Sequence, residues 1–325
     1  MKTRDLRNAV VVITGASSGI GRAAALAFAR KGARLALAAR RSRVLDEVAA
    51  ECRQLGVPAI AVPTDVTDPE AVENLAEQSI VRFGRIDVWI NNAGVGAVGS
   101  FTETPVESHD QVIRTNLIGY VHGAHAALRR FIRQRSGVLI NTISFGAWVP
   151  APFAAAYAAS KFGLRGLSES LRAEVQRWPD IHICDLYPSF MDTPGVQHGA
   201  NYTGRVLKPA PPVYSPERAA RAMVSLAENP QNATTIGAIA TLAKLGYDLA
   251  PSLTRWAADR FIRLYLQQAK PAPKTEGNLF HPIPEGTGTT GGWRSPGERA
   301  AVVTGLVVAV VVGGLLLLGQ RRTAA

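Results

Sequence analysis

The chain has 325 residues, 47% of them hydrophobic, and a formal net charge of +11. This hydrophobic fraction is enough for a sizeable core and excludes wholesale disorder. The positive charge suits an anionic cofactor or an anionic membrane surface. No basic helix interleaved with aromatic residues is present, so we expect no nucleic-acid partner. The only cysteines are Cys52 and Cys184, which excludes a disulfide framework, favours a reducing compartment and gives no reason to expect a metal site.

Short apolar runs alternate with helical patterns over most of the chain. A first group of strands is predicted at 8–13, 34–39, 59–63 and 86–90, with a helix at 20–31 after the first strand. Further helices are predicted near 106–133, 153–178 and 215–228, and further strands near 137–142, 181–187 and 233–240. The apolar runs do not alternate with polar residues, which indicates strands covered on both faces. The pattern therefore predicts an α/β fold with a Rossmann-type doubly wound parallel sheet of about seven strands.

The turn between the first strand and the first helix is rich in glycine. Gly15, Gly19 and Gly21 let the backbone come close to a pyrophosphate, whose charge then lies at the helix N-terminus. A tight turn without a ligand would also use glycines. The position of these glycines between a buried strand and an amphipathic helix favours a dinucleotide site.

The end of the second predicted strand indicates which dinucleotide is bound. NAD-dependent enzymes place an acidic residue there to bind the ribose hydroxyls. This chain has Ala39 followed by Arg40 and Arg41, and two guanidinium groups can bind a 2′-phosphate bidentately. The alternative is that both arginines are simply solvated. We predict NADP(H).

A serine, a tyrosine and a lysine form the candidate catalytic set. Tyr157 and Lys161 are four residues apart, which places them on one face of a helix. An ammonium group beside a phenol favours the phenolate, so the pair can donate a proton near neutral pH. Ser144 follows the buried strand at 137–142 and could polarise a carbonyl held against the tyrosine. A single Y-x-x-x-K motif is weak support, because a surface tyrosine on an alanine-rich helix would look the same.

Taken together, the motifs resemble those of the short-chain dehydrogenase/reductase family over about residues 5–240. The matching residues, in order, are Thr14-Gly15-Ala16-Ser17-Ser18-Gly19-Ile20-Gly21, Asn91-Asn92-Ala93-Gly94, Asn116, Ser144, and Tyr157 with Lys161. In the family, the tyrosine exchanges a proton with the substrate oxygen. The lysine lowers the tyrosine pKa and holds the nicotinamide ribose, the serine positions the carbonyl, and the asparagine distorts its helix and holds a water that supports the lysine.

The resemblance also implies the cofactor contacts. They are Gly15, Ser17, Ser18, Gly19, Ile20, Gly21, Arg40, Arg41, Asp65, Val66, Asn92, Ala93, Gly94, Tyr157, Lys161 and Thr193. Asp65 would contact the adenine, although a solvated loop aspartate is an equal alternative from the residues alone. Thr193 would bind the carboxamide. Ser189 stands where the family usually has glycine, which puts the geometry of that loop in doubt. Residues 195–214 lack periodicity and fit a substrate lid.

The chain changes character after residue 250. We expect a catalytic domain at 1–250, an amphipathic helix at 251–270, a flexible linker at 271–299, a transmembrane helix at 300–320 and a short tail at 321–325. The amphipathic helix could pack on the domain or lie on a membrane. The run at 301–319 has no charged residue and is long enough to cross a bilayer. Because no signal peptide precedes the first strand, the catalytic domain is expected on the cytoplasmic side.

These features predict a membrane-anchored, NADP(H)-dependent oxidoreductase that interconverts a ketone or aldehyde and an alcohol. Phe145, Trp148, Phe153, Phe190 and Met191 flank the catalytic groups in the sequence, which favours an apolar, lipid-like or steroid-like substrate. The alternatives are a 3-oxoacyl thioester reductase and, in another class, a non-catalytic NADPH-binding sensor or scaffold. A homo-oligomer is expected.

Overall fold

The computed structural model describes residues 3–294. Seven parallel strands form the central sheet in the order β3-β2-β1-β4-β6-β7-β9. The strands are β1 (Val10–Thr14), β2 (Arg34–Ala39), β3 (Ala59–Pro63), β4 (Val88–Asn91), β6 (Gly137–Thr142), β7 (Ile181–Pro188) and β9 (Ala233–Ile236). The order reverses direction between β1 and β4, as a doubly wound sheet requires. The predicted fold class and strand number are confirmed.

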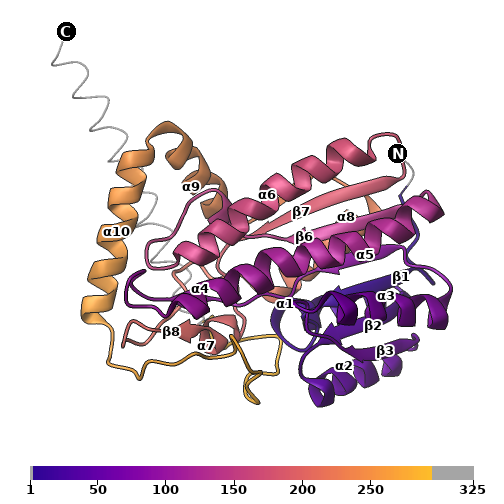
Figure 1. Cartoon of the computed structure of the whole chain (residues 1–325), viewed down its shortest axis with the longest axis horizontal. Coiled ribbons are helices and arrows are strands. Elements are labelled where there is room, and N and C mark those ends of the chain that lie inside the picture. Colours follow the sequence, from indigo (N-terminus) through magenta and orange to yellow (C-terminus); the bar gives the residue numbers. More distant parts are fainter. Residues whose placement is uncertain (1–2, 295–325) are drawn as a thin grey trace, which may run out of the picture.

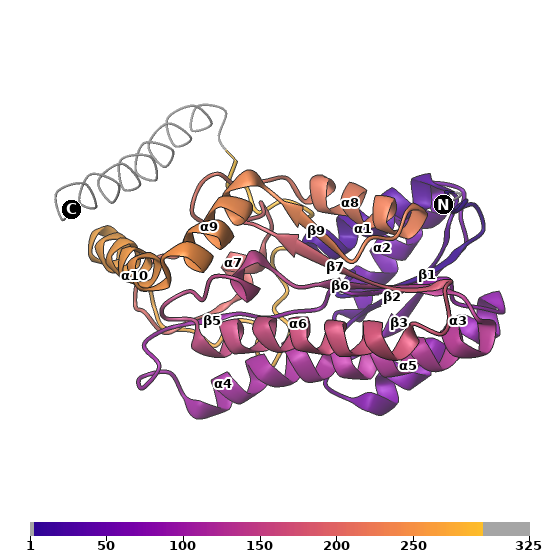
Figure 2. The same cartoon turned by 90° about the horizontal axis from the view of Figure 1, so that it is seen from above.

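Helices cover both faces of this sheet (Figures 1 and 2). One face carries α1 (Gly19–Arg30), α2 (Ser42–Gln54) and α8 (Pro216–Glu228). The other carries α3 (Pro69–Phe83), α5 (Gly119–Gln134) and α6 (Ala155–Val175), with α4 (Val106–Ile113) at one end. Because both faces are covered, the strands are apolar throughout, and β1 is buried at all five positions.

The helix predicted near 106–133 is interrupted. A π-helical turn, Arg114–Ile118, separates α4 from α5. Asn116 lies in the middle of this turn. Asparagine has a low α-helical propensity, which is consistent with the interruption of the helix here. Single π-turns of this kind are frequent at functional sites.

The last predicted strand is shorter than expected. β9 ends at Ile236 because Gly237 has a φ of 100°, and α9 (Ala238–Leu249) begins directly after it. Only four residues pair with β7, from Ala233 opposite Asp185 to Ile236 opposite Pro188. The apolar sequence that suggested a strand to residue 240 therefore belongs partly to a helix.

The predicted amphipathic helix at 251–270 is present as α10 (Pro251–Gln268). It forms a hairpin with α9 beyond the end of the sheet, the orange helices of Figures 1 and 2. α10 contains no buried residue, and Trp256 and Phe261 are more than half exposed. None of the helices within 3–294 combines the length and apolarity needed to cross a membrane. The predicted transmembrane helix at 300–320 lies outside the described residues.

The segment predicted as a flexible linker is different from expectation over its described part, 271–294. It contains no long helix or strand, but it follows the surface of the domain and makes specific contacts (yellow in Figure 1). Thr275 exchanges two backbone hydrogen bonds with Asn201, the last residue of β8 (Ala200–Asn201). Leu279 is fully buried. Proline and glycine exclude regular elements here, but they do not prevent the chain from packing.

Candidate active site

A cavity of about 530 Å³ lies at the carboxyl ends of the parallel strands. Ligands of doubly wound proteins bind in this place, beside the point where the strand order reverses. The predicted residues on its wall are Gly15, Ser17, Ser18, Gly19, Ile20, Arg40, Arg41, Asp65, Val66, Asn92, Ala93, Gly94, Ser144, Tyr157, Lys161 and Thr193. Gly21 and Asn116 lie behind the wall and support it, as described below.

Tyr157 and Ser144 face each other across the catalytic end of the cavity. Tyr157 is in the first turn of α6, and Ser144 follows the end of β6. Burial raises the pKa of Tyr157, and its hydrogen-bonding contact with Ser144 lowers that pKa by less. The Ser144 Oγ accepts a hydrogen bond from the backbone N–H of Gly146 at 3.1 Å, which fixes the serine side chain. The pair can therefore bind one carbonyl oxygen between two hydroxyl groups.

Lys161 is one turn further along the same face of α6 and is buried. Its Nζ donates to the carbonyl oxygen of Thr142 at 3.2 Å and lies 5.6 Å from the centre of the Tyr157 ring. Burial lowers the pKa of Lys161 to about 7. Burial is thus the main influence on both pKa values. From the sequence we expected the charge of the lysine to be the main influence on the tyrosine pKa.

One participant near the lysine was not predicted from the sequence. Tyr120 is buried on α5, its hydroxyl donates to the same Thr142 carbonyl oxygen at 2.9 Å, and Lys161 Nζ lies 5.2 Å from the centre of its ring. Burial raises the pKa of Tyr120, so its hydroxyl stays protonated. A neutral ring face beside a cation is attractive. Tyr120 therefore helps to hold the lysine head.

Asn116 connects the π-helical turn to the loop after β4. Its Oδ1 accepts from the backbone N–H of Val95 at 2.8 Å, and its Nδ2 donates to the Val95 carbonyl oxygen at 2.9 Å. Nδ2 also lies 3.4 Å from Ser160 Oγ, which in turn donates to the Tyr157 carbonyl oxygen at 2.7 Å. The expected distortion of the helix at Asn116 is confirmed. The asparagine supports the site through backbone and neighbouring side chains.

The glycine-rich turn is held by the motif after β4. Asn92 Nδ2 donates to the Thr14 carbonyl oxygen at 3.0 Å, and its backbone N–H donates to Thr14 Oγ1 at 3.0 Å. A Cβ on Gly21 would overlap the carbonyl oxygen of Gly15, so only glycine allows α1 to start this close to the turn. The N-terminus of α1 consequently points toward the cavity, where the positive end of the helix dipole can attract an anion.

The other end of the cavity is strongly basic. Arg40 and Arg41 lie on its wall, and Arg22 is close enough to lower the pKa of Arg41 by repulsion. Burial is the largest cause of the lowered pKa of both cavity arginines, and only Asp65 raises that of Arg40. Asp65 itself accepts hydrogen bonds from the backbone and side chain of Thr67. Such a cluster of cations fits a phosphate dianion.

Two cavity residues carry polar atoms that fit a polar ligand. Thr142 Oγ1 and Ser189 Oγ are buried and have no hydrogen-bond partner within 3–294. Ser189 replaces the expected glycine without strain, because the non-glycine residues of that range with positive φ do not include it. Thr193 is on the wall as predicted. The residues present therefore fit a dinucleotide with a phosphate at its basic end.

The apolar residues predicted to flank the catalytic groups divide into two groups. Phe145, Phe190 and Met191 line the cavity. Trp148 instead packs against Tyr187, with ring centres 5.3 Å apart, and is not on the cavity wall. Phe153 likewise does not line the cavity. The wall at the catalytic end is nevertheless largely apolar.

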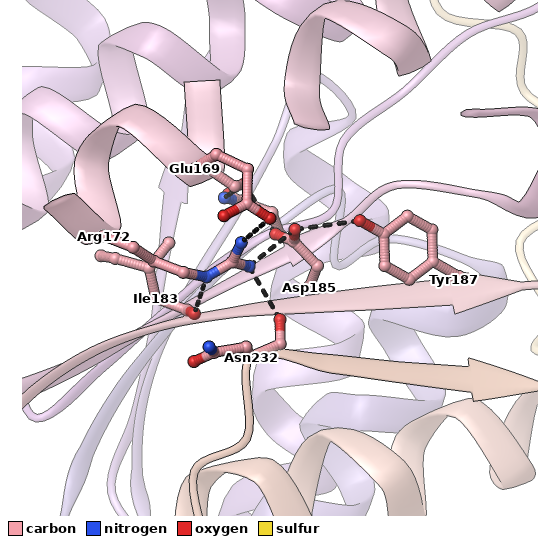
Figure 3. Close-up of polar contacts among 8 residues, drawn as sticks. Glu169, Arg172, Ile183, Asp185, Tyr187 and Asn232 are labelled. Atoms are coloured by element: carbon pink, nitrogen blue, oxygen red, sulfur yellow. Dashed lines mark hydrogen bonds and ion pairs between the residues drawn. The ribbon is translucent and has the colours of Figure 1, made fainter. Parts of the chain in front are cut away.

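A buried ion pair fixes α6 against the sheet below the site (Figure 3). Arg172 of α6 binds the carboxylate of Asp185 on β7 at 2.7 Å, and the Tyr187 hydroxyl donates to that carboxylate at 3.0 Å. Arg172 also donates to the Asn232 carbonyl oxygen at 2.7 Å. Asp185 is 1% exposed, and burial raises its pKa even with the arginine beside it. This network sets the position of the helix that carries the tyrosine and lysine.

Comparison with known proteins agrees with this geometry. The family described as short chain dehydrogenase matches residues 9–201. The chain belongs to the short-chain dehydrogenase family. The uncharacterized oxidoreductase YxnA of Bacillus subtilis is 34% identical over 94% of this chain and 91% of its own. The 11-beta-hydroxysteroid dehydrogenase A of Sesamum indicum is 38% identical over 59% of this chain and 55% of its own.

A solved structure relates this short-chain dehydrogenase to its cofactor. The alcohol dehydrogenase of Thermococcus sibiricus, complexed with 5-hydroxy-NADP, has a TM-score of 0.62 and 31% identity, covering 70% of this chain and 95% of its own. Together with the arginines at the end of β2, this makes the protein an NADP-dependent short-chain dehydrogenase/reductase. The predicted enzyme class and cofactor are confirmed.

Proposed function

We propose that this short-chain dehydrogenase interconverts a ketone or aldehyde and an alcohol on an apolar, lipid-like or steroid-like substrate. The observation that carries the proposal is the wall of the cavity beside Ser144 and Tyr157, where Phe145, Phe190 and Met191 leave few polar groups for a sugar or charged metabolite. The steroid dehydrogenase named among the relatives supports the same substrate class.

The residues at this end of the cavity divide the chemistry between them. Bound NADPH supplies the hydride. Ser144 holds and polarises the substrate carbonyl, and Tyr157 donates the proton to its oxygen or takes it back in the reverse direction. Lys161, with a pKa of about 7, changes charge near neutral pH. A charged lysine favours loss of the tyrosine proton. Asn116 keeps the first turn of α6 and the loop after β4 in register through Ser160 and Val95.

A substrate panel tests the proposal. Consumption of NADPH by the purified full-length protein is measured against ketones that range from steroids and long-chain ketones to a 3-oxoacyl thioester, with Tyr157→Phe as the inactive control. Apolar ketones should give the highest kcat/KM. Preference for the thioester would favour a 3-oxoacyl thioester reductase, and NADPH binding without turnover of any ketone would favour a sensor or scaffold.

The proposal includes attachment to a membrane, with the catalytic domain on the cytoplasmic side. The uncharged sequence at 301–319 supports an anchor. The exposed apolar side chains of the α9–α10 hairpin support contact with the same bilayer; the large ones are Leu245, Leu249, Leu253, Trp256, Phe261 and Leu264. Arginines at 255, 260 and 263 of α10 would suit anionic headgroups.

Membrane attachment is tested in cells that express the full chain. The protein should stay with membranes after an alkaline wash, and protease added to the cytoplasmic side should digest the catalytic domain. Val310→Arg places a charge in the middle of the apolar run and should release the protein, because a central arginine costs about 2.5–3.5 kcal/mol on insertion scales. Val81→Arg, at an exposed position of α3, is the matched control.

We also propose that the protein is a homo-oligomer. The groove between α5 and α6 is lined by apolar residues, among them Leu128, Leu167 and Trp178, and Val121 and Ile132 beside them are more than one-third exposed. A second copy of the same helices would cover this surface. Light scattering of the purified protein should give a multiple of the chain mass, and Val121→Glu should reduce it. A single-chain mass for the unaltered protein would contradict the proposal.

A further inference from the structure

The described end of the chain crosses the basic end of the cofactor cavity. We call residues 278–293 the strap. Arg40 donates from Nη2 to the Asn278 carbonyl oxygen at 2.5 Å, and from Nη1 to those of Leu279 and Phe280, both at 3.2 Å. Arg41 donates from Nη1 to the carbonyl oxygens of residues 283 and 285, at 3.3 and 3.0 Å. Each of these acceptors is a neutral backbone group.

The two arginines lie between the strap and the rest of the cavity. The Nε and Nη2 edge of Arg41 is directed to Ser17, with Nε 3.3 Å and Nη2 3.2 Å from its Oγ, and Ser17 lines the cavity. Nη1, on the other side of the guanidinium, faces the strap. For Arg41, the edge that can bind a phosphate bidentately is thus directed toward the cavity, whereas both Nη atoms of Arg40 donate to the strap.

The strap is itself fixed to the domain on both sides of this contact. Leu279 is fully buried in the apolar cluster around Val95 and Tyr202. At the far end, Trp293 donates from Nε1 to the Thr193 carbonyl oxygen at 3.0 Å and from its backbone N–H to Asp192 Oδ1 at 2.8 Å. Between them, the Gly19 N–H donates to the Gly288 carbonyl oxygen at 2.9 Å. The strap therefore forms a wall with a defined position.

One side chain of this wall indicates that a ligand binds beside it. Asn278 lines the cavity, and its Oδ1 is buried without a hydrogen-bond partner within 3–294. Its backbone is held on both sides, since its carbonyl oxygen accepts from Arg40 and its N–H donates to the His198 carbonyl oxygen at 2.8 Å. Oδ1 can only accept a hydrogen bond, whereas Nδ2 of the same amide can donate one to a phosphate oxygen. Asn278 therefore lies next to Arg40 with hydrogen-bonding capacity that the protein leaves unused.

We propose that the strap is the second wall of the 2′-phosphate subsite, and that Asn278 binds the phosphorylated ribose of NADP(H). The carbonyl oxygens of the strap hold Arg40 and Arg41 in place before the cofactor arrives, which reduces the entropic cost of ordering these side chains on binding. The strap thereby adds to the selection of NADP(H) over NAD(H). This goes beyond the proposed oxidoreductase function, because it concerns cofactor recognition and does not depend on the substrate.

Cofactor affinity tests the role of Asn278. Dissociation constants for NADPH and NADH are measured by fluorescence titration for the full-length protein, Asn278→Ala, and Thr290→Ala, an exposed strap residue, as matched control. Asn278→Ala keeps the backbone carbonyl oxygen that Arg40 uses. It should weaken NADPH binding about tenfold, the effect of one hydrogen bond to a charged group, and change NADH binding less than twofold. Unchanged or tighter NADPH binding, or equal weakening for both cofactors, would overturn the assignment.

Hydrogen exchange of the unaltered protein tests the position of the strap and does not depend on a variant folding. Amide exchange of peptides that cover 278–293 is followed alone, with NADP⁺ and with NAD⁺, each at saturation. If the strap closes on the phosphate, NADP⁺ should slow exchange there clearly more than NAD⁺. Faster exchange with NADP⁺ would mean that the phosphate and the strap compete for the arginines, and it would overturn the proposal. Equal exchange with both cofactors would do so as well.

Discussion

The two ends of the cofactor cavity are built in different ways. At the catalytic end, Tyr157 and Lys161 come from one helix, and the groups that hold them lie on strands and helices of the same sheet domain. At the basic end, Arg40 and Arg41 are held by backbone carbonyl oxygens about 240 residues later in the chain. The first end depends on the core of the fold. The second depends on a peripheral segment that a change can loosen without unfolding the sheet.

The largest expected effect is at the catalytic end. Tyr157→Phe removes the hydroxyl that exchanges the proton, so kcat should fall by about 10²–10⁴-fold, the usual contribution of general acid–base catalysis. NADPH affinity should stay nearly unchanged, because the ring is retained. Stopped-flow turnover and fluorescence titration measure the two quantities. Residual turnover together with weak NADPH binding would contradict the assigned role.

The next prediction concerns a variant that removes the hydrogen bonds supporting the catalytic end. Asn116→Leu leaves the buried N–H and carbonyl oxygen of Val95 without partners, and each unsatisfied group costs about 1–3 kcal/mol. The free energy of unfolding, measured in urea, should fall by about that amount or more. Gln231→Leu is the matched control, since that residue is exposed. An equal loss in Gln231→Leu would contradict the role of Asn116.

The basic end should respond more selectively. Ala39→Asp with Arg40→Ala removes one phosphate partner and adds an acceptor for the ribose hydroxyls. The ratio of kcat/KM for NADPH to that for NADH should fall more than about tenfold, since one charge-assisted bond contributes about 1.5 kcal/mol or more. Turnover at saturating cofactor should change little. An unchanged ratio would mean that Arg40 does not contact the phosphate.

The smallest effect concerns the charge of Lys161. Its pKa falls from 10.5 to about 7 on folding because of burial. Between pH 7 and 10.5 the unfolded chain therefore binds more protons at this position, and the free energy of unfolding rises with pH, by at most about 1.4 kcal/mol per pH unit. Urea unfolding from pH 7.0 to 8.0, below the ordinary pKa values of cysteine and tyrosine, measures the slope. Lys161→Met should reduce that slope, and an equal slope in both proteins would contradict the buried, partly neutral lysine.

The contrast between the two ends also explains what the sequence could predict. The spacing of Tyr157 and Lys161, the glycines of the first turn and the unbroken apolar strands are local patterns with direct physical causes. They predicted the fold and the residues on the cavity wall. The role of residues 278–293 could not be predicted in this way, because it depends on backbone carbonyl oxygens, which every residue has. Gly237 shows a related difficulty, since a single positive φ ended a strand within an apolar run.

The π-helical turn explains the spacing of the buried residues on either side of it. Ser108, Val112, Asn116, Tyr120 and Ala124 are all buried and recur every four residues. On a regular helix of 3.6 residues per turn, a repeat of four advances by about 40° each time, so the fifth residue would face about 160° away from the first. One inserted residue corresponds to about 100° of rotation. The turn around Asn116 thus absorbs most of the phase drift and keeps five side chains on one face. The extra residue is a spacer, and its deletion would rotate everything before it away from the site.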